Sequence, residues 1–443
     1  MSNLSGCRLV LAEGETRKPR WVYSVFPISL ATGPLGTLVT LYLIQANGIA
    51  LGTIYSGLAA AIYNGVSIPA AIFWGFLTDT LHKRRPLIFA SNALVGAALI
   101  SFYVDTTTAG AIARYSTISF VSVASATPLN LLIMETEPKG RWATAFARLS
   151  MLSSVGNVFG LLLGTFWTDA LPSSLTLLFV PLGVFALASA LIVLVTISEP
   201  SFVLERKTVA MRKPSFLSRL MINPVFILGL PRASDFRRVF RGLKSSLTSY
   251  LPLFYISTSL FYFSSGLFNT SFVPAMQNSS LSDQEVFGVI LAGMVVQTVA
   301  FQYAGKFTSE RPLATSSAQG LLLRGWCYIA IGASLVLIAG RLFVVPAVIL
   351  YPLAAGVAFA LYYTSSNTMM FNTVHGANAG SSLGVYSAVV GVATMGGSLA
   401  SGFVSVYLGF YVTFILAGVL LFGAVWALMR LPKSATPQGG PHQ

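Results

Sequence analysis

The segment from Ala50 to Trp74 contains no charged side chain and exceeds the roughly 20 apolar residues that cross a bilayer as a helix. Asp79 and the consecutive cations Lys83, Arg84 and Arg85 follow it closely, and Pro86 opens another apolar run. A span that stops at a compact charged cluster predicts two membrane helices joined by a short polar hairpin. Because backbone polar groups inside a bilayer must be satisfied within the segment, helices are the expected structure of every such run.

The whole chain follows this pattern. Hydrophobic residues make up 55% of its 443 residues, charged residues only 9%, and the mean hydropathy is +0.75. These values exclude a water-soluble globule and predict an all-α polytopic membrane protein. Uncharged runs give twelve candidate spans, beginning near Trp21, Ala50, Leu87, Ala109, Trp142, Leu175, Tyr250, Val286, Leu321, Phe343, Ser381 and Phe410.

The net charge of +14 comes from cations whose positions along the chain follow a membrane topology. Most Lys and Arg residues fall in the N-terminal tail, in alternate loops and in one long polar segment, which predicts that both termini are cytoplasmic and that the protein is a multi-pass protein of the plasma membrane. Arg148 and Arg324 are placed near the cytoplasmic side within helices, and Arg114 and Arg341 near the other side. This placement accounts for the charge without a nucleic-acid partner.

Cysteine and motif content exclude several other classes. Cys7 lies in the tail and Cys327 inside a predicted helix, so we expect neither a disulfide framework nor a metal site. No Gly-x-x-x-x-Gly-Lys-Ser/Thr loop is present, and no His, Cys or Asp cluster sits at catalytic depth. We therefore predict that the chain is not an enzyme, has no catalytic residues and needs no cofactor.

The predicted spans divide into two similar halves. Residues 75–79 resemble residues 305–309, and Asn130 ends the fourth span as Asn367 ends the tenth. The predicted domains are a cytoplasmic tail (1–20), a six-helix bundle (21–198), a cytoplasmic linker (199–248), a second six-helix bundle (249–430) and a disordered cytoplasmic tail (431–443). We expect a monomer.

The linker contains a predicted basic amphipathic helix. Apolar residues recur at Phe236, Val239, Phe240 and Leu243, with arginine and lysine on the opposite face. The favoured interpretation is a helix lying on an anionic inner leaflet, which makes the lipid bilayer a partner. Regulatory binding is the alternative.

The hairpin after the second span resembles the conserved loop of the major facilitator superfamily. Gly75, Leu77, Asp79, Arg84 and Arg85 match that pattern, and His82 replaces its second glycine. The resemblance implies twelve transmembrane helices in two pseudo-symmetric six-helix halves. It also implies a secondary transporter that works by alternating access, with a small-molecule substrate bound between the halves.

A second segment similar to the family follows the fourth span, where Glu135, Pro138 and Arg141 form a Glu-x-x-Pro-x-x-Arg pattern. The resemblance implies a conformational latch whose charges pair in one state and separate in another. Partly buried pairs suit such a switch, because desolvation offsets much of their attraction. Topogenic charge is the alternative. The predicted latch comprises Gly75, Asp79, Arg84, Arg85, Glu135 and Arg141.

Arg114 is the unusual cation, because it lies inside the fourth span, where a charge is costly. Drug antiporters of the superfamily have an arginine at a similar place, although the residues that follow it there are absent here. Arg114 either contacts substrate, or reaches the outer surface or pairs with Asp105 or Asp169.

The remaining candidates are neutral. No acidic residue or histidine is expected at mid-membrane depth, which argues against a buried proton-carrying carboxylate and against a lipophilic cation as substrate. Amides and hydroxyls beside aromatic rings suit a neutral or weakly anionic metabolite. The alternative for each residue is helix cross-linking or lipid contact. The predicted substrate-binding residues are Arg114, Asn130, Tyr262, Asn269 and Asn367.

Three functions remain open from the sequence. Transport of a neutral or weakly anionic metabolite is the first, and export of hydrophobic drugs, favoured by the aromatic seventh span, is the second. A non-transporting membrane sensor or scaffold is the third.

Repeated glycines in the fifth and eleventh spans, such as Gly156, Gly160 and Gly402, predict close helix packing.

Overall fold

The computed structural model describes residues 23–81, 84–104, 107–136, 142–170, 175–197, 252–338, 340–373 and 379–431. These residues form helices and the short turns between them, with no strand in the described ranges. The helices are α1 (Val25–Thr32), α2 (Leu35–Leu81), α3 (Arg85–Ser101), α4 (Thr108–Thr136), α5 (Trp142–Ala170), α6 (Leu175–Thr196), α11 (Pro252–Asn278), α12 (Asp283–Ser309), α13 (Leu313–Leu337), η3 (Gly340–Phe343), α14 (Val344–Tyr351), η4 (Pro352–Ala358), α15 (Phe359–Thr373), α16 (Ala379–Tyr407) and α17 (Phe410–Met429).

The long helix α2 reverses direction at Gly48, whose φ is 75°. A Cβ built on Gly52 would lie 2.6 Å from the Cα of Ile44, a residue that a straight helix would place about 12 Å away. Only glycine adopts a positive φ without steric cost, so Gly48 permits the reversal. Residues 35–47 therefore continue the rod begun by α1, and residues 49–81 form the next rod, as the predicted spans near Trp21 and Ala50 require.

The all-helical membrane fold is confirmed. Eight stretches of the described residues are long and apolar enough to cross a membrane, and one of them, Val25–Ala71, includes the reversal. The predicted span starts at Trp142, Leu175 and Phe410 coincide with the first residues of α5, α6 and α17. The count of twelve spans and the domain boundaries stay predictions.

One predicted span start disagrees with the structure, and some predicted segments lie outside the described residues. One span start was wrong: α13 begins at Leu313, well before the expected Leu321. The predicted linker, its amphipathic helix and both tails lie outside the described residues, except for a few residues at their edges.

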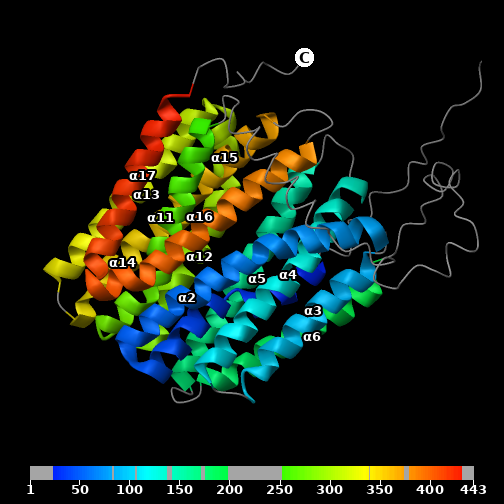
Figure 1. Cartoon of the computed structure of the whole chain (residues 1–443), viewed down its shortest axis with the longest axis horizontal. Helices are drawn as coiled ribbons and strands as arrows, with labels where there is room; N and C mark the ends of the chain where they lie inside the picture. Colours follow the sequence, from blue (N-terminus) through cyan, green and yellow to red (C-terminus); the bar gives the residue numbers. More distant parts are fainter. Residues whose placement is uncertain are drawn as a thin grey trace, which may run out of the picture.

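The helices pack as two groups. Helices α1 to α6 pack on one another, and so do α11 to α17. The groups meet where α2 packs along α16 and α11, and where α5 packs along α12. Figure 1 shows α2 and α16 running side by side between the groups.

Serine side chains join the helices of the second group. Ser257 and Ser264 on α11 donate to the carbonyl oxygens of Ala424 and Ala417 on α17, at 2.9 and 2.7 Å. One heptad further on, Ser271 lies 2.6 Å from the hydroxyl of Ser405 on α16. Such bonds contribute about 0.6 kcal/mol each inside a membrane, and the small side chains let the helices approach closely. They hold α11 against α16 and α17.

The rod that contains residues 340–373 is irregular. Its middle section, Pro352–Ala358, is π-helical, between the α-helical turns of α14 and α15. Within it, a Cβ on Gly356 would lie 2.9 Å from the backbone nitrogen of Gln297 on α12. Widened turns of this kind occur frequently at functional sites, and here the turn precedes the aromatic residues of α15.

Candidate functional site

The two groups of helices are joined by Asp283 at the end of the molecule that carries Gly48. The carboxylate of Asp283 accepts a hydrogen bond at 2.9 Å from Nε2 of Gln45, which belongs to α2. It accepts a second bond at 2.7 Å from Nε2 of Gln277, near the end of α11. The carboxylate thereby bridges the two groups.

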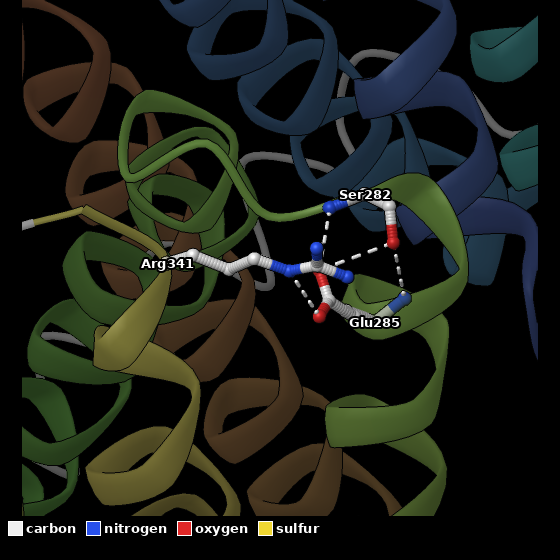
Figure 2. A network of polar contacts seen from close by, with 3 residues as sticks. All are labelled: Ser282, Glu285 and Arg341. Carbon is white, nitrogen blue, oxygen red and sulfur yellow. Dashed lines mark hydrogen bonds and ion pairs between the residues drawn. The ribbon is translucent and has the colours of Figure 1, made fainter.

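A second carboxylate fixes the start of α12 at the same end. Glu285 and Ser282 form a capping box, in which the Ser282 backbone nitrogen donates to Glu285 at 2.8 Å. Glu285 also pairs with Nε of Arg341 at 2.8 Å, and Figure 2 shows the three residues together. Arg341 lies on η3, so this largely exposed pair stays within the second group.

Glycines allow α2 and α16 to cross closely. A Cβ on Gly57 would lie 2.9 Å from the Cα of Gly402, and one on Gly391 would lie 2.6 Å from a side-chain carbon of Ile68. Close packing by Gly156 and Gly160 on α5 is likewise confirmed, since both face the backbone of α1. At Gly57 and Gly402 the backbones of the two groups approach without an intervening side chain.

Tyrosines gather on the second group beside this crossing. Tyr262 on α11 lies near Tyr386 on α16 and near Tyr363 on α15. Behind Tyr262, Phe261 stacks on Tyr362 with ring centroids 3.8 Å apart. Three different helices thus bring phenol groups to one place, which we call the tyrosine cluster: Tyr262, Tyr363 and Tyr386.

Two predicted amides are placed relative to this cluster. Asn269 is exposed and follows Tyr262 by two helical turns on the same face of α11. Asn367 is half-buried and follows Tyr363 by one turn on the same face of α15. Three predicted substrate-binding residues therefore belong to faces that include or continue the tyrosine cluster.

Arg114 lies elsewhere, among the helices of the first group. Its guanidinium carbon is 5.4 Å from the ring centroid of Phe102, and Phe102 in turn stacks on Phe179 at 4.2 Å. The next residue, Tyr115, stacks on Tyr63 at 4.3 Å. This geometry places Arg114 against aromatic side chains of the first group. Its contact with substrate, and the alternatives of reaching the outer surface or pairing with Asp105 or Asp169, stay predictions.

Arg324 is the functional candidate that sequence reasoning missed. It was placed near the cytoplasmic side because its span was expected to begin near Leu321. Because α13 begins at Leu313, Arg324 lies near the middle of the helix, and only 2% of it is exposed. Uncharged residues run from Leu313 to Ile338 on both sides of Arg324, and this symmetry was the available signal.

The surroundings of Arg324 are aromatic. Its Nε donates to the hydroxyl of Tyr328 at 2.6 Å, and its guanidinium carbon lies 4.9 Å from the ring centroid of Phe261 and 5.4 Å from that of Phe359. Its Nη1 is buried without a hydrogen-bond acceptor. In the described part of the chain no carboxylate pairs with Arg324, so aromatic faces and one hydroxyl stabilise the charge.

The predicted latch is described only in part. Arg85 donates to the carbonyl oxygen of Leu194 near the end of α6, where a cation is favourable for the helix dipole. Arg84 precedes α3 as its cap residue. The surroundings of four other predicted residues fall outside the description: Gly75, Asp79, Asn130 and Glu135. Arg141 lies outside the described residues entirely.

Acidic residues of the described ranges keep to helix ends. Asp169 is the last residue but one of α5, Asp283 begins α12, and Glu310 follows its end. No group of three metal-ligating side chains occurs in these ranges. Away from the helix ends, the described residues therefore offer phenols, amides, hydroxyls and the buried Arg324 as polar groups.

Comparisons with solved structures find the same architecture. The chain superposes with a TM-score of 0.74 on a POT family transporter in complex with a thioalcohol-conjugated peptide, at 11% identity, covering 94% of this chain and 96% of that one. A bacterial homolog of the human lysosomal transporter Spinster, inward-facing and occupied, gives 0.67 at 14% identity, covering 95% and 98%. A variant of the nucleoside transporter NupG gives 0.62 at 15% identity, covering 94% and 99%.

Sequence comparison gives the family. A comparison with curated proteins finds no match. The family model described as Major Facilitator Superfamily matches residues 21–301, which is more than half of the chain. The hairpin after Gly75 and the helical architecture agree with that match. The chain belongs to the major facilitator superfamily.

Proposed function

We propose that this transporter moves a small neutral or weakly anionic organic solute across the plasma membrane by alternating access. The observation that carries the proposal is the charge inside the helices. Arg324 is buried near the middle of α13, and the acidic residues of the described ranges lie at helix ends. An interior of this character attracts negative charge and offers a cation no counter-charge.

The contacts between the two groups support alternating access. The bridge from Gln45 to Asp283 and the crossing of Gly57 with Gly402 lie toward the end that carries Gly48. Among the described residues, these contacts at the Gly48 end fit a state that is closed on that side. By the distribution of cations this is the outer side, so the state would be open to the cytoplasm.

Export of hydrophobic compounds is the second candidate. The tyrosine cluster and the stacked pair of Phe261 and Tyr362 provide aromatic surface for an apolar ligand. The neighbours in structure differ in ligand, since one is a complex with a thioalcohol-conjugated peptide and another is a nucleoside transporter, so shared architecture leaves the substrate open.

A ligand panel separates these functions. The melting temperature of the purified protein is measured with nucleosides, short peptides, organic anions and lipophilic cations, because ligand at one hundred times its Kd stabilises by about 2.7 kcal/mol. Hits are followed by uptake into proteoliposomes for the native protein, Tyr262→Phe and Asn367→Ala. Arg341→Gln is the control, since Arg341 is 70% exposed and lies at the far end of the site.

The two candidates give opposite results. Stabilisation by neutral or anionic solutes, weakened in Tyr262→Phe or Asn367→Ala but kept in Arg341→Gln, supports the proposal. Stabilisation by lipophilic cations alone would favour the exporter and overturn the argument from charge.

A further inference from the structure

An apolar groove lies between α12 and the rod formed by η4 and α15. Its volume is about 490 Å³, and its lining is hydrophobic apart from one phenol group. The lining residues are Val295, Val296, Val299, Ala300, Tyr303, Ala304, Phe307, Val357 and Leu361. A groove of this size is large enough for a ligand, and side chains of this kind match hydrocarbon.

The groove faces away from the tyrosine cluster. Phe301 contacts Phe359 and Tyr363 on the side of the cluster. Val299 and Tyr303 precede and follow Phe301 by two residues, so they lie about 160° away from it around the helix. Half or more of each of these two side chains is exposed. In a membrane, this face of the second group contacts lipid.

The length of the groove matches one leaflet. From Val295 to Phe307 the helix rises by about 18 Å, close to half of the roughly 30 Å hydrocarbon core. The Phe307 end carries a net positive charge, because Lys306 and Arg311 outnumber Glu310 there. Arg311 is exposed, with its guanidinium carbon 4.2 Å from the ring centroid of Phe307. Lys306 is exposed and follows Val299 by seven residues, on the face that lines the groove.

We propose that this groove binds one phospholipid with an anionic headgroup from the cytoplasmic leaflet. Its acyl chain lies along α12 from Phe307 to Val295, and its phosphate is held by Arg311 and Lys306. The cations sit at the end that the charge distribution assigns to the cytoplasm, where anionic lipids attract basic groups by about 1 kcal/mol for each cation. A zwitterionic lipid of equal chain length would gain the apolar contact without the net attraction.

Native mass spectrometry of the detergent-purified full chain tests the site. The protein is titrated with phosphatidylglycerol and with phosphatidylcholine of identical acyl chains, and bound lipid is counted. The variants are Lys306→Gln with Arg311→Gln, and Ala300→Phe, which fills the groove. Arg430→Gln is the matched control, because Arg430 is also exposed and stacks on an aromatic ring, that of Trp426 at 4.1 Å.

The expected result is a saturable phosphatidylglycerol adduct that exceeds the phosphatidylcholine adduct at least fivefold, as about 1 kcal/mol or more implies. It should fall severalfold in the double variant and remain in Arg430→Gln. Equal binding of the two lipids, or equal losses in the double variant and in Arg430→Gln, would overturn the proposal. Both charged positions are exposed, so the double variant is informative even where Ala300→Phe fails to fold.

Discussion

Arg324 donates from Nε to the hydroxyl oxygen of Tyr328, one turn further along α13, at 2.6 Å. This bond is its only one to an acceptor in the described part of the chain, since Nη1 is buried without a partner. Removing a charge from water without a carboxylate beside it is costly, even with aromatic faces nearby. A charge kept under these conditions is a functional candidate, and its loss should affect transport more than folding.

We predict that Arg324→Met leaves the melting temperature unchanged or raised and lowers uptake at least tenfold. Methionine replaces the buried charge with an apolar side chain of similar length, and such replacements are often neutral or stabilising. Uptake of the solute found in the ligand panel and the melting temperature are measured on the same preparation. Tyr328→Phe, which removes only the acceptor hydroxyl, is the control for local packing.

A different outcome would give Arg324 a structural role. If Arg324→Met retains uptake but loses several degrees of melting temperature, the arginine serves to pack against Phe261 and Phe359. Full retention of both properties would remove it from the functional candidates.

Hydropathy and charge predicted the fold because each span obeys a local rule. An uncharged run of sufficient length defines a helix, and cations mark the cytoplasmic ends, so starts such as Trp142 and Phe410 were located to the residue. The expected start of α13 was eight residues late, because the more polar segment 313–320 precedes the apolar run that begins at Leu321. The spans near Trp21 and Ala50 implied a connection between them, but only the positive φ of Gly48 shows how tightly the chain turns there.

We predict that Gly57→Ala weakens the closed end, because its new Cβ would lie 2.9 Å from the Cα of Gly402, a backbone atom that cannot move aside. Overpacking typically costs about 1–3 kcal/mol, and here it would destabilise the state in which α2 and α16 cross closely. Uptake into proteoliposomes should fall severalfold. Gly288→Ala is the matched control, because nothing lies within 4 Å of its built Cβ and alanine favours a helix.

Equal effects of the two alanines would contradict this prediction, since only Gly57 lies at the crossing. A loss of folded protein confined to Gly57→Ala would instead show that the crossing is needed for assembly of the two groups.

The candidate site was less predictable than the fold. Tyr262, Asn269 and Asn367 were chosen by residue type, and their faces adjoin the tyrosine cluster because helical periodicity is regular. Contacts between distant segments, such as Gln45 with Asp283, depend on how the two groups dock, which no local pattern encodes. The aromatic enclosure of Arg324 likewise needs three helices to be placed together.

We predict that Asp79→Asn leaves membrane insertion intact and reduces uptake. The substitution keeps the shape of the side chain and removes the charge that the latch would exchange with Arg84 or Arg85. Expression, melting temperature and uptake are measured together, with Glu310→Gln as an exposed acid at the matching hairpin of the second half. Unchanged uptake in Asp79→Asn would contradict the latch and would mean that the charges of the hairpin serve only to set the membrane topology.

We predict that Gln45→Ala opens the outer end more often. It removes the 2.9 Å bond to Asp283 that joins the groups, while the bond of Asp283 to Gln277 within the second group remains. One hydrogen bond is worth about 1 kcal/mol, so the population open to the outside should rise roughly fivefold. The readout is the rate at which Asn269→Cys reacts with a membrane-impermeant maleimide added from outside.

The labelling is done with Cys7 and Cys327 replaced by alanine, so that only the introduced thiol reacts. Arg341→Gln is the matched control, since it breaks an ion pair at the same end that lies within the second group and joins no group to the other. A faster rate in Gln45→Ala alone identifies the bridge as part of the outer gate. Equal acceleration in both variants would mean that the end has loosened as a whole, and unchanged rates would mean that the glycine crossing of α2 and α16 holds the end closed without the bridge.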